Sequence, residues 1–168
     1  STAEPTEKEN ILEPQAEEEN DEPQVTQSIP SYTINYRYDE NDLIGTGGAK
    51  TKFKNNIDAI KTLKKIESEN RLAKADEQHI LAKYAGWGGI PQAFDAKLSG
   101  WEKEYCELKG LLEDDEYAAA RSSVNTSHYT NKPIIDGIYQ ALNQFGFNGG
   151  NVLEPSMGIG NFFSLFPE

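Results

Sequence analysis

The chain has too few cysteines, long apolar runs and histidines for a disulfide-bonded, a membrane-spanning or a metal-binding protein. It has one cysteine, Cys106, among 168 residues, so it cannot form an internal disulfide, and we expect a cytoplasmic protein in a reducing compartment. No apolar run approaches the ~18 residues of a membrane-spanning helix, so we expect no membrane partner. Two histidines and one cysteine are too few for a plausible metal site, and we expect no bound metal.

Apolar residues are also scarce, at 36% of the chain with a mean hydropathy of -0.70, and the net charge is -12. Most of that charge lies in residues 1–30, which hold nine acidic residues, one basic residue and half of the eight prolines, but no glycine or aromatic residue. Such a segment buries too little surface to offset its chain entropy. We interpret residues 1–30 as a disordered acidic linker, with an acidic recognition tail as the alternative.

Residues 31–122 have the pattern of a helical region. Apolar residues at helical spacing predict helices at about 52–69, 75–85 and 114–122, and the pair Ser99 and Glu102 predicts a capping box that starts another. Gly86 stands where a left-handed C-cap belongs, so we expect a positive φ there. For Trp87 and Phe94 we favour core packing over base stacking.

Residues 123–168 combine a helix with a strand and a glycine turn. Pro133 fits the first turn of a helix whose apolar stripe comprises Ile134, Ile135, Ile138, Leu142 and Phe145. Residues 151–153 then predict a short buried strand, followed by glycines and the start of another helix. A strand delivers the chain to the carboxyl edge of a sheet, where ligands of open α/β sheets bind.

The most specific string is Glu154-Pro155-x-x-Gly158-x-Gly160-x-Phe162. The two glycines lack Cβ atoms, which lets the backbone turn sharply and approach a ligand closely. The dinucleotide fingerprint would require a further glycine at position 163, which is phenylalanine. A purely structural glycine loop remains the alternative.

This string resembles the S-adenosylmethionine (AdoMet) binding motif of amino-methyltransferases. In DNA enzymes of that class, a Tyr-Thr-Pro-like element precedes the helix and lines the methionine end of the cofactor, and residues 129–133 are similar in order, although the proline comes later. The resemblance implies a set of cofactor-binding residues: Tyr129, Thr130, Glu154, Pro155, Gly158 and Gly160.

Two upstream strings, at 45–56 and 84–94, resemble the N-terminal region of methyltransferase–helicase proteins encoded by conjugative transposons, plasmids and phages. The resemblance implies AdoMet-dependent methylation of adenine N6 in DNA, for modification or anti-restriction, with DNA as the partner of the whole protein. It also implies a mainly α chain: a helical N-terminal region at 31–122, then at 123–168 the first helix and strand of an α/β methyltransferase fold, truncated after the AdoMet motif.

The chain itself lacks a catalytic loop. Adenine methylation requires an Asp/Asn/Ser-Pro-Pro-aromatic loop that holds the flipped base, and the sequence has no Pro-Pro pair. We therefore expect no catalytic residues here and an inactive fragment. Two alternatives stay open: a non-catalytic helical module of an anti-restriction protein that docks DNA or protein, and a fragment of a protein or RNA methyltransferase. The sequence does not predict an oligomeric state.

Overall fold

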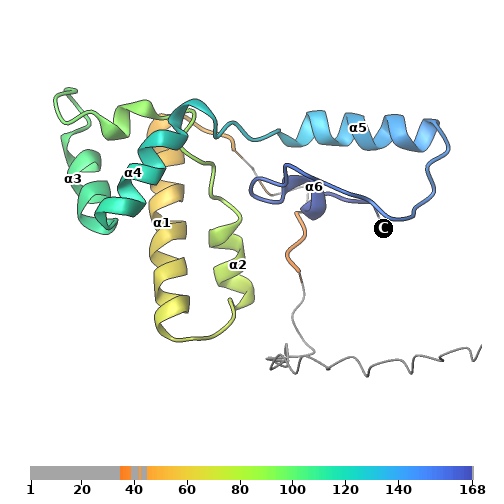
Figure 1. The fold of residues 1–168 in the computed structure, drawn as a ribbon, viewed down its shortest axis with the longest axis horizontal. Helices are drawn as coiled ribbons and strands as arrows, with labels where there is room; N and C mark the ends of the chain where they lie inside the picture. Colours follow the sequence, from red (N-terminus) through yellow and green to blue (C-terminus); the bar gives the residue numbers. More distant parts are fainter. Residues whose placement is uncertain (1–34, 39–41, 43–44, 168) are drawn as a thin grey trace, which may run out of the picture. The chain divides into compact units, whose positions relative to one another are not determined.

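The computed structural model describes residues 35–38, 42 and 45–167, which belong to one compact unit, Thr33–Glu168. This part of the chain is mainly helical and contains no strand (Figure 1). None of its helices has the length and apolar character to cross a membrane. The predicted linker at 1–30 lies outside the described residues. The helices are α1 (Ala49–Ser68), α2 (Ala75–Leu81), η1 (Pro91–Phe94), α3 (Glu102–Leu111), α4 (Asp114–Ser122), η2 (Ser123–Asn125), α5 (Lys132–Gln144) and α6 (Asn161–Ser164).

The helices of the 45–125 region follow the sequence prediction with two corrections. Helix α2 ends at Leu81, because the next residues form tighter turns in which Lys83 and Tyr84 donate to carbonyls only three residues back. Gly86 has the predicted positive φ, 70°, but lies in the following turn and does not cap the helix. The predicted Ser99 cap is also wrong, since the Glu102 carboxylate accepts instead from the Gly100 N–H at 2.9 Å.

One hydrophobic core joins α1, α3, α4 and the turn that leads into η1. Trp87 and Phe94 are buried there, with their ring centroids 5.3 Å apart and the planes nearly perpendicular. Burying a large apolar side chain contributes roughly 1.5–3 kcal/mol, so these rings are major contributors to stability. The prediction of core packing for both residues is confirmed. The buried core comprises Phe53, Ile57, Trp87, Ile90, Ala93, Phe94, Leu108 and Tyr117.

Lysines of α1 form ion pairs along the rim of this core. Five of the six α1 lysines lie within 4.0 Å of a carboxylate, and three of these pairs connect α1 to α3 or α4. Exposed pairs of this kind each contribute about 0–1 kcal/mol, so they fix helix register more than they stabilise the fold. The pairs are Lys50–Glu104, Lys54–Asp58, Lys61–Glu107, Lys64–Glu116 and Lys65–Glu77.

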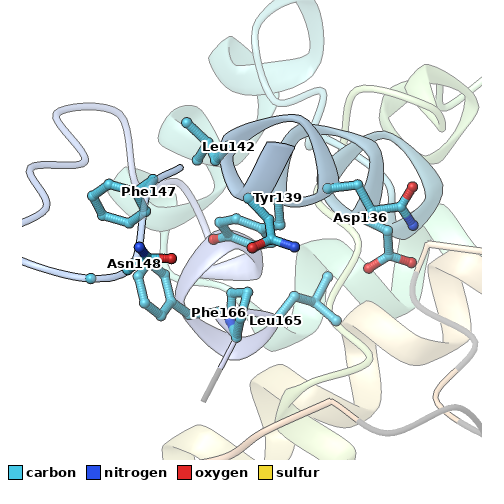
Figure 2. A pocket seen from close by; sticks show the side chains of 11 residues that line it. Asp136, Tyr139, Leu142, Phe147, Asn148, Leu165 and Phe166 are labelled. Carbon is cyan, nitrogen blue, oxygen red and sulfur yellow. The ribbon is translucent and has the colours of Figure 1, made fainter. Parts of the chain in front are cut away.

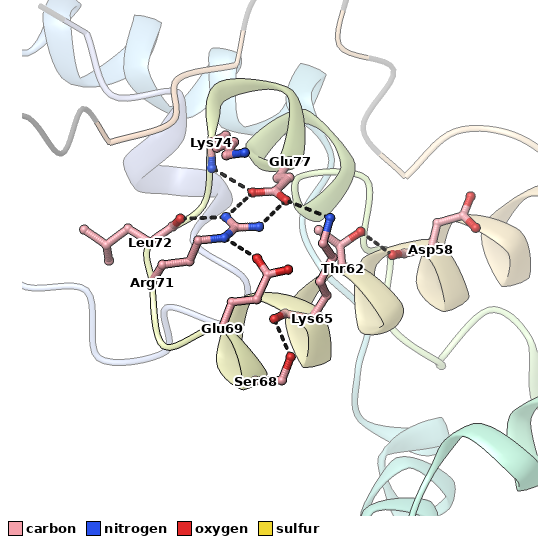
Figure 3. Close-up of polar contacts among 9 residues, drawn as sticks. All are labelled: Asp58, Thr62, Lys65, Ser68, Glu69, Arg71, Leu72, Lys74 and Glu77. Carbon is pink, nitrogen blue, oxygen red and sulfur yellow. Dashed lines mark hydrogen bonds and ion pairs between the residues drawn. The ribbon is translucent and has the colours of Figure 1, made fainter.

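A buried carboxylate, Glu77, closes the connection between α1 and α2 (Figure 3). Its two oxygens accept from the two terminal nitrogens of Arg71, each at 2.6 Å, and one also accepts from the Lys74 N–H at 2.9 Å. The hydrogen bonds from Arg71, followed by the one from Lys74, lower the pKa of Glu77 to about 2. The ionised form is therefore the one that the fold stabilises.

This arrangement predicts acid-sensitive stability. Glu77 has an ordinary pKa of 4.5, so its contribution is complete above that pH and is lost as pH falls from 4.5 towards 2. We expect Glu77→Gln to lower the melting temperature by several degrees at pH 7, and the difference from wild type to vanish near pH 2. Thermal melts at both pH values test this, with Glu67→Gln on the exposed face of α1 as the control. A constant difference across the range would contradict the pairing.

Helix α5 packs on the C-terminal segment through one aromatic residue. The Tyr139 ring lies 6.2 Å from Phe162 and 5.5 Å from Phe166, between ring centroids, and its hydroxyl donates to the Phe162 carbonyl at 2.6 Å. Asn131 caps the helix by accepting from the Ile134 N–H at 3.3 Å, and Pro133 lies in the first turn. The predicted helix and the place of its proline are confirmed.

The predicted buried strand at 151–153 is not formed. The segment has no regular structure, and Val152 and Leu153 are 50% and 88% exposed. A strand requires a neighbour for its backbone hydrogen bonds, and the described residues provide none. Most of the α5 stripe is exposed for the same reason: of its five members, only Ile135 is buried. The described residues thus contain the predicted helix and a glycine turn, but no strand, and they do not form the α/β part of the expected fold.

Candidate ligand-binding cleft

Three segments that are distant in the sequence surround a cleft of about 210 Å³. One is the turn after α2, the second precedes α5, and the third is the glycine turn that leads into α6; Gly45 and, from α1, Lys52 complete the lining. The cleft contains polar side chains from all three. Its lining residues are Gly45, Lys52, Tyr84, Ala85, Gly89, Ser127, His128, Tyr129, Thr130, Asn131, Ile159 and Asn161.

The first segment is held by Asn56, a fully buried residue of α1. Its amide nitrogen donates to the Gly86 carbonyl at 2.8 Å, and its amide oxygen accepts from the Ala85 N–H at 2.7 Å. Both ends of one side chain therefore fix two consecutive residues of the turn. The signal in the sequence was a polar residue on the apolar face of the predicted helix, beside Ile57, and we did not assign it a role.

The Tyr129 ring packs against the backbone of two glycines from the other segments. A Cβ on Gly86 would lie 2.6 Å from Tyr129 Cε2, and a Cβ on Gly158 would lie 3.0 Å from Tyr129 Cδ1 and Cε1. Both glycines also have positive φ, 70° and 57°. No other residue type combines that backbone with that clearance. The aromatic residue and the glycine turn that the sequence singled out are therefore in direct contact.

The second and third segments are also joined by Asn161, which is 4% exposed. Its amide nitrogen donates to the Thr130 carbonyl at 3.0 Å. The Tyr38 hydroxyl lies 3.1 Å from the Asn161 amide oxygen and 3.2 Å from the Ala82 carbonyl. Burial, with a smaller effect of the Asp42 charge, raises the pKa of Tyr38 to about 12, so this hydroxyl is a donor at neutral pH. Asn161 follows Gly160 directly in the motif, but its role requires the tertiary contact.

Tyr84 lines the cleft and contributes a protonated hydroxyl to it. Burial, and to a lesser degree the neighbouring Tyr129, raises the pKa of Tyr84 to about 12. No aspartate or glutamate is among the lining residues, although the chain has 28. The cleft therefore offers hydroxyl and amide groups without a carboxylate, which favours a ligand that carries hydrogen-bond acceptors or a negative charge.

The six residues assigned from the resemblance are not all in this cleft. Tyr129 and Thr130 line it, and Gly158 contacts Tyr129. Gly160, with a φ of 85°, is the N-cap of α6. Glu154 and Pro155 do not line the cleft.

The Glu154 carboxylate instead accepts a hydrogen bond within its own segment, and its charge affects the pKa of Tyr139 in α5. Its carboxylate accepts from the Ser156 N–H at 2.8 Å. Burial first, and then the charge of Glu154, raises the pKa of Tyr139. No lysine or arginine of the described residues lies within 4.0 Å of this carboxylate. Glu154 is therefore not among the residues that line the cleft with Tyr129 and Thr130.

A larger hollow of about 690 Å³ lies between α5 and the C-terminal segment (Figure 2). Figure 2 shows Tyr139 and Leu142 of α5 across from Leu165 and Phe166. Two of its polar groups already have partners, because Asp136 pairs with Lys132 at 2.8 Å and the Tyr139 hydroxyl donates to a backbone carbonyl. It contains none of the six assigned residues, so the smaller cleft is the better candidate site.

No protein-family model, curated protein or solved structure matches the chain. Within the described residues, no group of three or more His, Cys, Asp or Glu side chains is placed to hold a metal ion.

Proposed function

We propose that this chain is part of an AdoMet-dependent DNA adenine-N6 methyltransferase, and that the cleft binds the methionine end of the cofactor. One observation carries the proposal: Tyr129 packs against the backbone of Gly158, while Asn161 bonds the Thr130 carbonyl. Two sequence elements that each resemble part of one cofactor site are therefore adjacent. A purely structural glycine loop would not require this contact.

The size of the cleft limits what it holds. Small-molecule sites usually enclose about 300–1,000 Å³, so a cleft of about 210 Å³ accommodates part of AdoMet and not the whole. The hydroxyls of Tyr84 and Thr130 and the amide of Asn131 suit the polar amino-acid portion. Bound AdoMet supplies an activated methyl group, and the residues here bind and orient its methionine end.

The exposed apolar surfaces support an α/β setting for the cleft. Ile134, Ile138, Leu142 and Phe145 recur on one face of α5 and are 38–85% exposed. Val152 and Leu153 are exposed as well. A helix and a strand that pack in a layered α/β fold present such surfaces to a sheet. In the proposed enzyme, the DNA contacts and the loop for the target base belong to other parts of the protein, because this chain is acidic and has no Pro-Pro pair.

The same α5 face favours the second candidate function, a non-catalytic module that docks another protein. An exposed apolar stripe on a helix is a common docking surface. The two candidates differ in one property, because a docking module has no reason to bind AdoMet. A protein or RNA methyltransferase would share the cofactor site and differ in its substrate.

Calorimetric titration of AdoMet tests the proposal. We expect weak binding by the wild-type chain, and binding at least about tenfold weaker, or about 1.4 kcal/mol, in Gly158→Ala, because the new Cβ displaces the Tyr129 ring. Gly100→Ala is the matched control: Gly100 also has a positive φ, 82°, but no atom lies within 4 Å of its added Cβ. Absence of AdoMet binding, or equal affinity in all three proteins, would overturn the proposal.

A further inference from the structure

Lys52 differs from every other lysine of α1. The other five lie within 4.0 Å of a carboxylate, whereas Lys52 has no such ion pair in the part of the chain that the structure describes. Its side chain lines the cleft, and its Nζ lies 3.7 Å from the position of a Cβ on Gly89. The α1 lysine without an ion pair is therefore the one that lines the candidate site.

Within the described residues, no carboxylate compensates the charge of Lys52. Among the cleft-lining residues, Lys52 and His128 are the side chains able to carry positive charge, and none carries a carboxylate. Every other α1 lysine in this acidic chain forms an ion pair with a carboxylate. A cation beside hydroxyl and amide donors, with no protein anion opposite, is complementary to an anionic group of a ligand.

The fold also fixes the position of the Lys52 backbone. The next residue, Phe53, is buried in the core, and Asn56 one turn later bonds the turn that forms one wall of the cleft. The backbone of α1 therefore holds the lysine at the cleft, on the same helix that shapes the wall. This placement requires no rearrangement of the helix for the amine to meet a ligand.

We propose that Lys52 binds the carboxylate of the amino-acid portion of the ligand in this cleft. The proposal rests on the proposed function, in which that portion is the methionine end of AdoMet. The helical region then contributes a binding residue to the cofactor site, and packing against residues 127–131 is part of forming the site.

The contribution of the amino-acid portion can be measured by comparing two thioether nucleosides that differ only in that portion. S-adenosylhomocysteine carries the amino-acid portion, and 5′-methylthioadenosine has a methyl group in its place. We expect the wild-type chain to bind the first more tightly. In Lys52→Met, which keeps the apolar stem and removes the charge, this preference should fall by about tenfold, with binding of 5′-methylthioadenosine unchanged. Lys54→Met, on the same helix but paired with Asp58, is the matched control and should keep the preference.

The outcomes are distinct when dissociation constants are measured by NMR titration on proteins with unchanged melting temperatures. A preference that persists in Lys52→Met would overturn the assignment of Lys52 and leave the proposed function standing. Loss of the preference in Lys54→Met as well would show a general charge effect and also overturn the assignment. A wild-type chain that binds neither nucleoside would overturn the proposed function and this inference together.

Discussion

Gly86→Ala is expected to destabilise the protein by about 2–5 kcal/mol. A Cβ at a φ of 70° costs about 1–2 kcal/mol because of its clash with the backbone. The same Cβ would lie 2.6 Å from Tyr129 Cε2 and 3.3 Å from the Ser127 carbonyl oxygen. Overpacking of this kind costs about 1–3 kcal/mol, and the ring cannot shift freely because Gly158 lies against it.

Urea unfolding at neutral pH measures this effect. Gly100→Ala is the control, because it has the same unfavourable backbone, with a φ of 82°, and its Cβ meets no atom within 4 Å. It should lose only the backbone part, about 1–2 kcal/mol. Equal losses in the two variants would show that Tyr129 does not pack on Gly86 and would contradict the geometry of the cleft.

Asn56→Leu is expected to lower the free energy of unfolding by about 2–5 kcal/mol. Leucine is similar in size but makes no hydrogen bond, so it leaves the Ala85 N–H and the Gly86 carbonyl without their partner. Each buried polar group left unpaired costs about 1–3 kcal/mol. The loss should also disorder the wall of the cleft, since one side chain holds both residues.

The neighbouring residue provides the control for this experiment. Asn55 precedes Asn56 on α1 and is half-buried, so Asn55→Leu makes the same chemical change on a less enclosed part of the helix. Its unfolding free energy should change by about 0.5 kcal/mol or less. If Asn56→Leu were as stable as Asn55→Leu in urea, the two hydrogen bonds to the turn would not be significant for stability.

The sequence predicted the features that depend on local chemistry. Helical periodicity located α1, α4 and α5 to within a few residues, and Pro133 lies in the first turn of α5 as expected. Gly86 has its predicted positive φ, since a glycine in that context indicates a left-handed turn. Its role was different, because the packing of Tyr129 on its backbone comes from a segment forty residues later.

Two local features were wrong, the Ser99 cap and the end of α2, and the other errors concern features that require a distant partner. The strand at 151–153 was predicted from its apolar pattern, but a strand forms only with a neighbour, and the described residues contain none. The roles of Asn56 and Asn161 were missed because an isolated asparagine on a helix carries no signal of what it bonds. Lys52 was missed for the same reason, since only the fold shows which α1 lysine has no ion pair within the described residues.

The most direct test of the AdoMet site is an NMR titration of the wild-type chain with AdoMet. We expect the backbone amide signals of Tyr129, Thr130 and residues 158–161 to shift together with a single dissociation constant. Signals around Tyr139, beside the larger hollow, should stay in place. A protein whose amide signals do not move, or move only around Tyr139, would contradict the assignment of the cleft as the cofactor site.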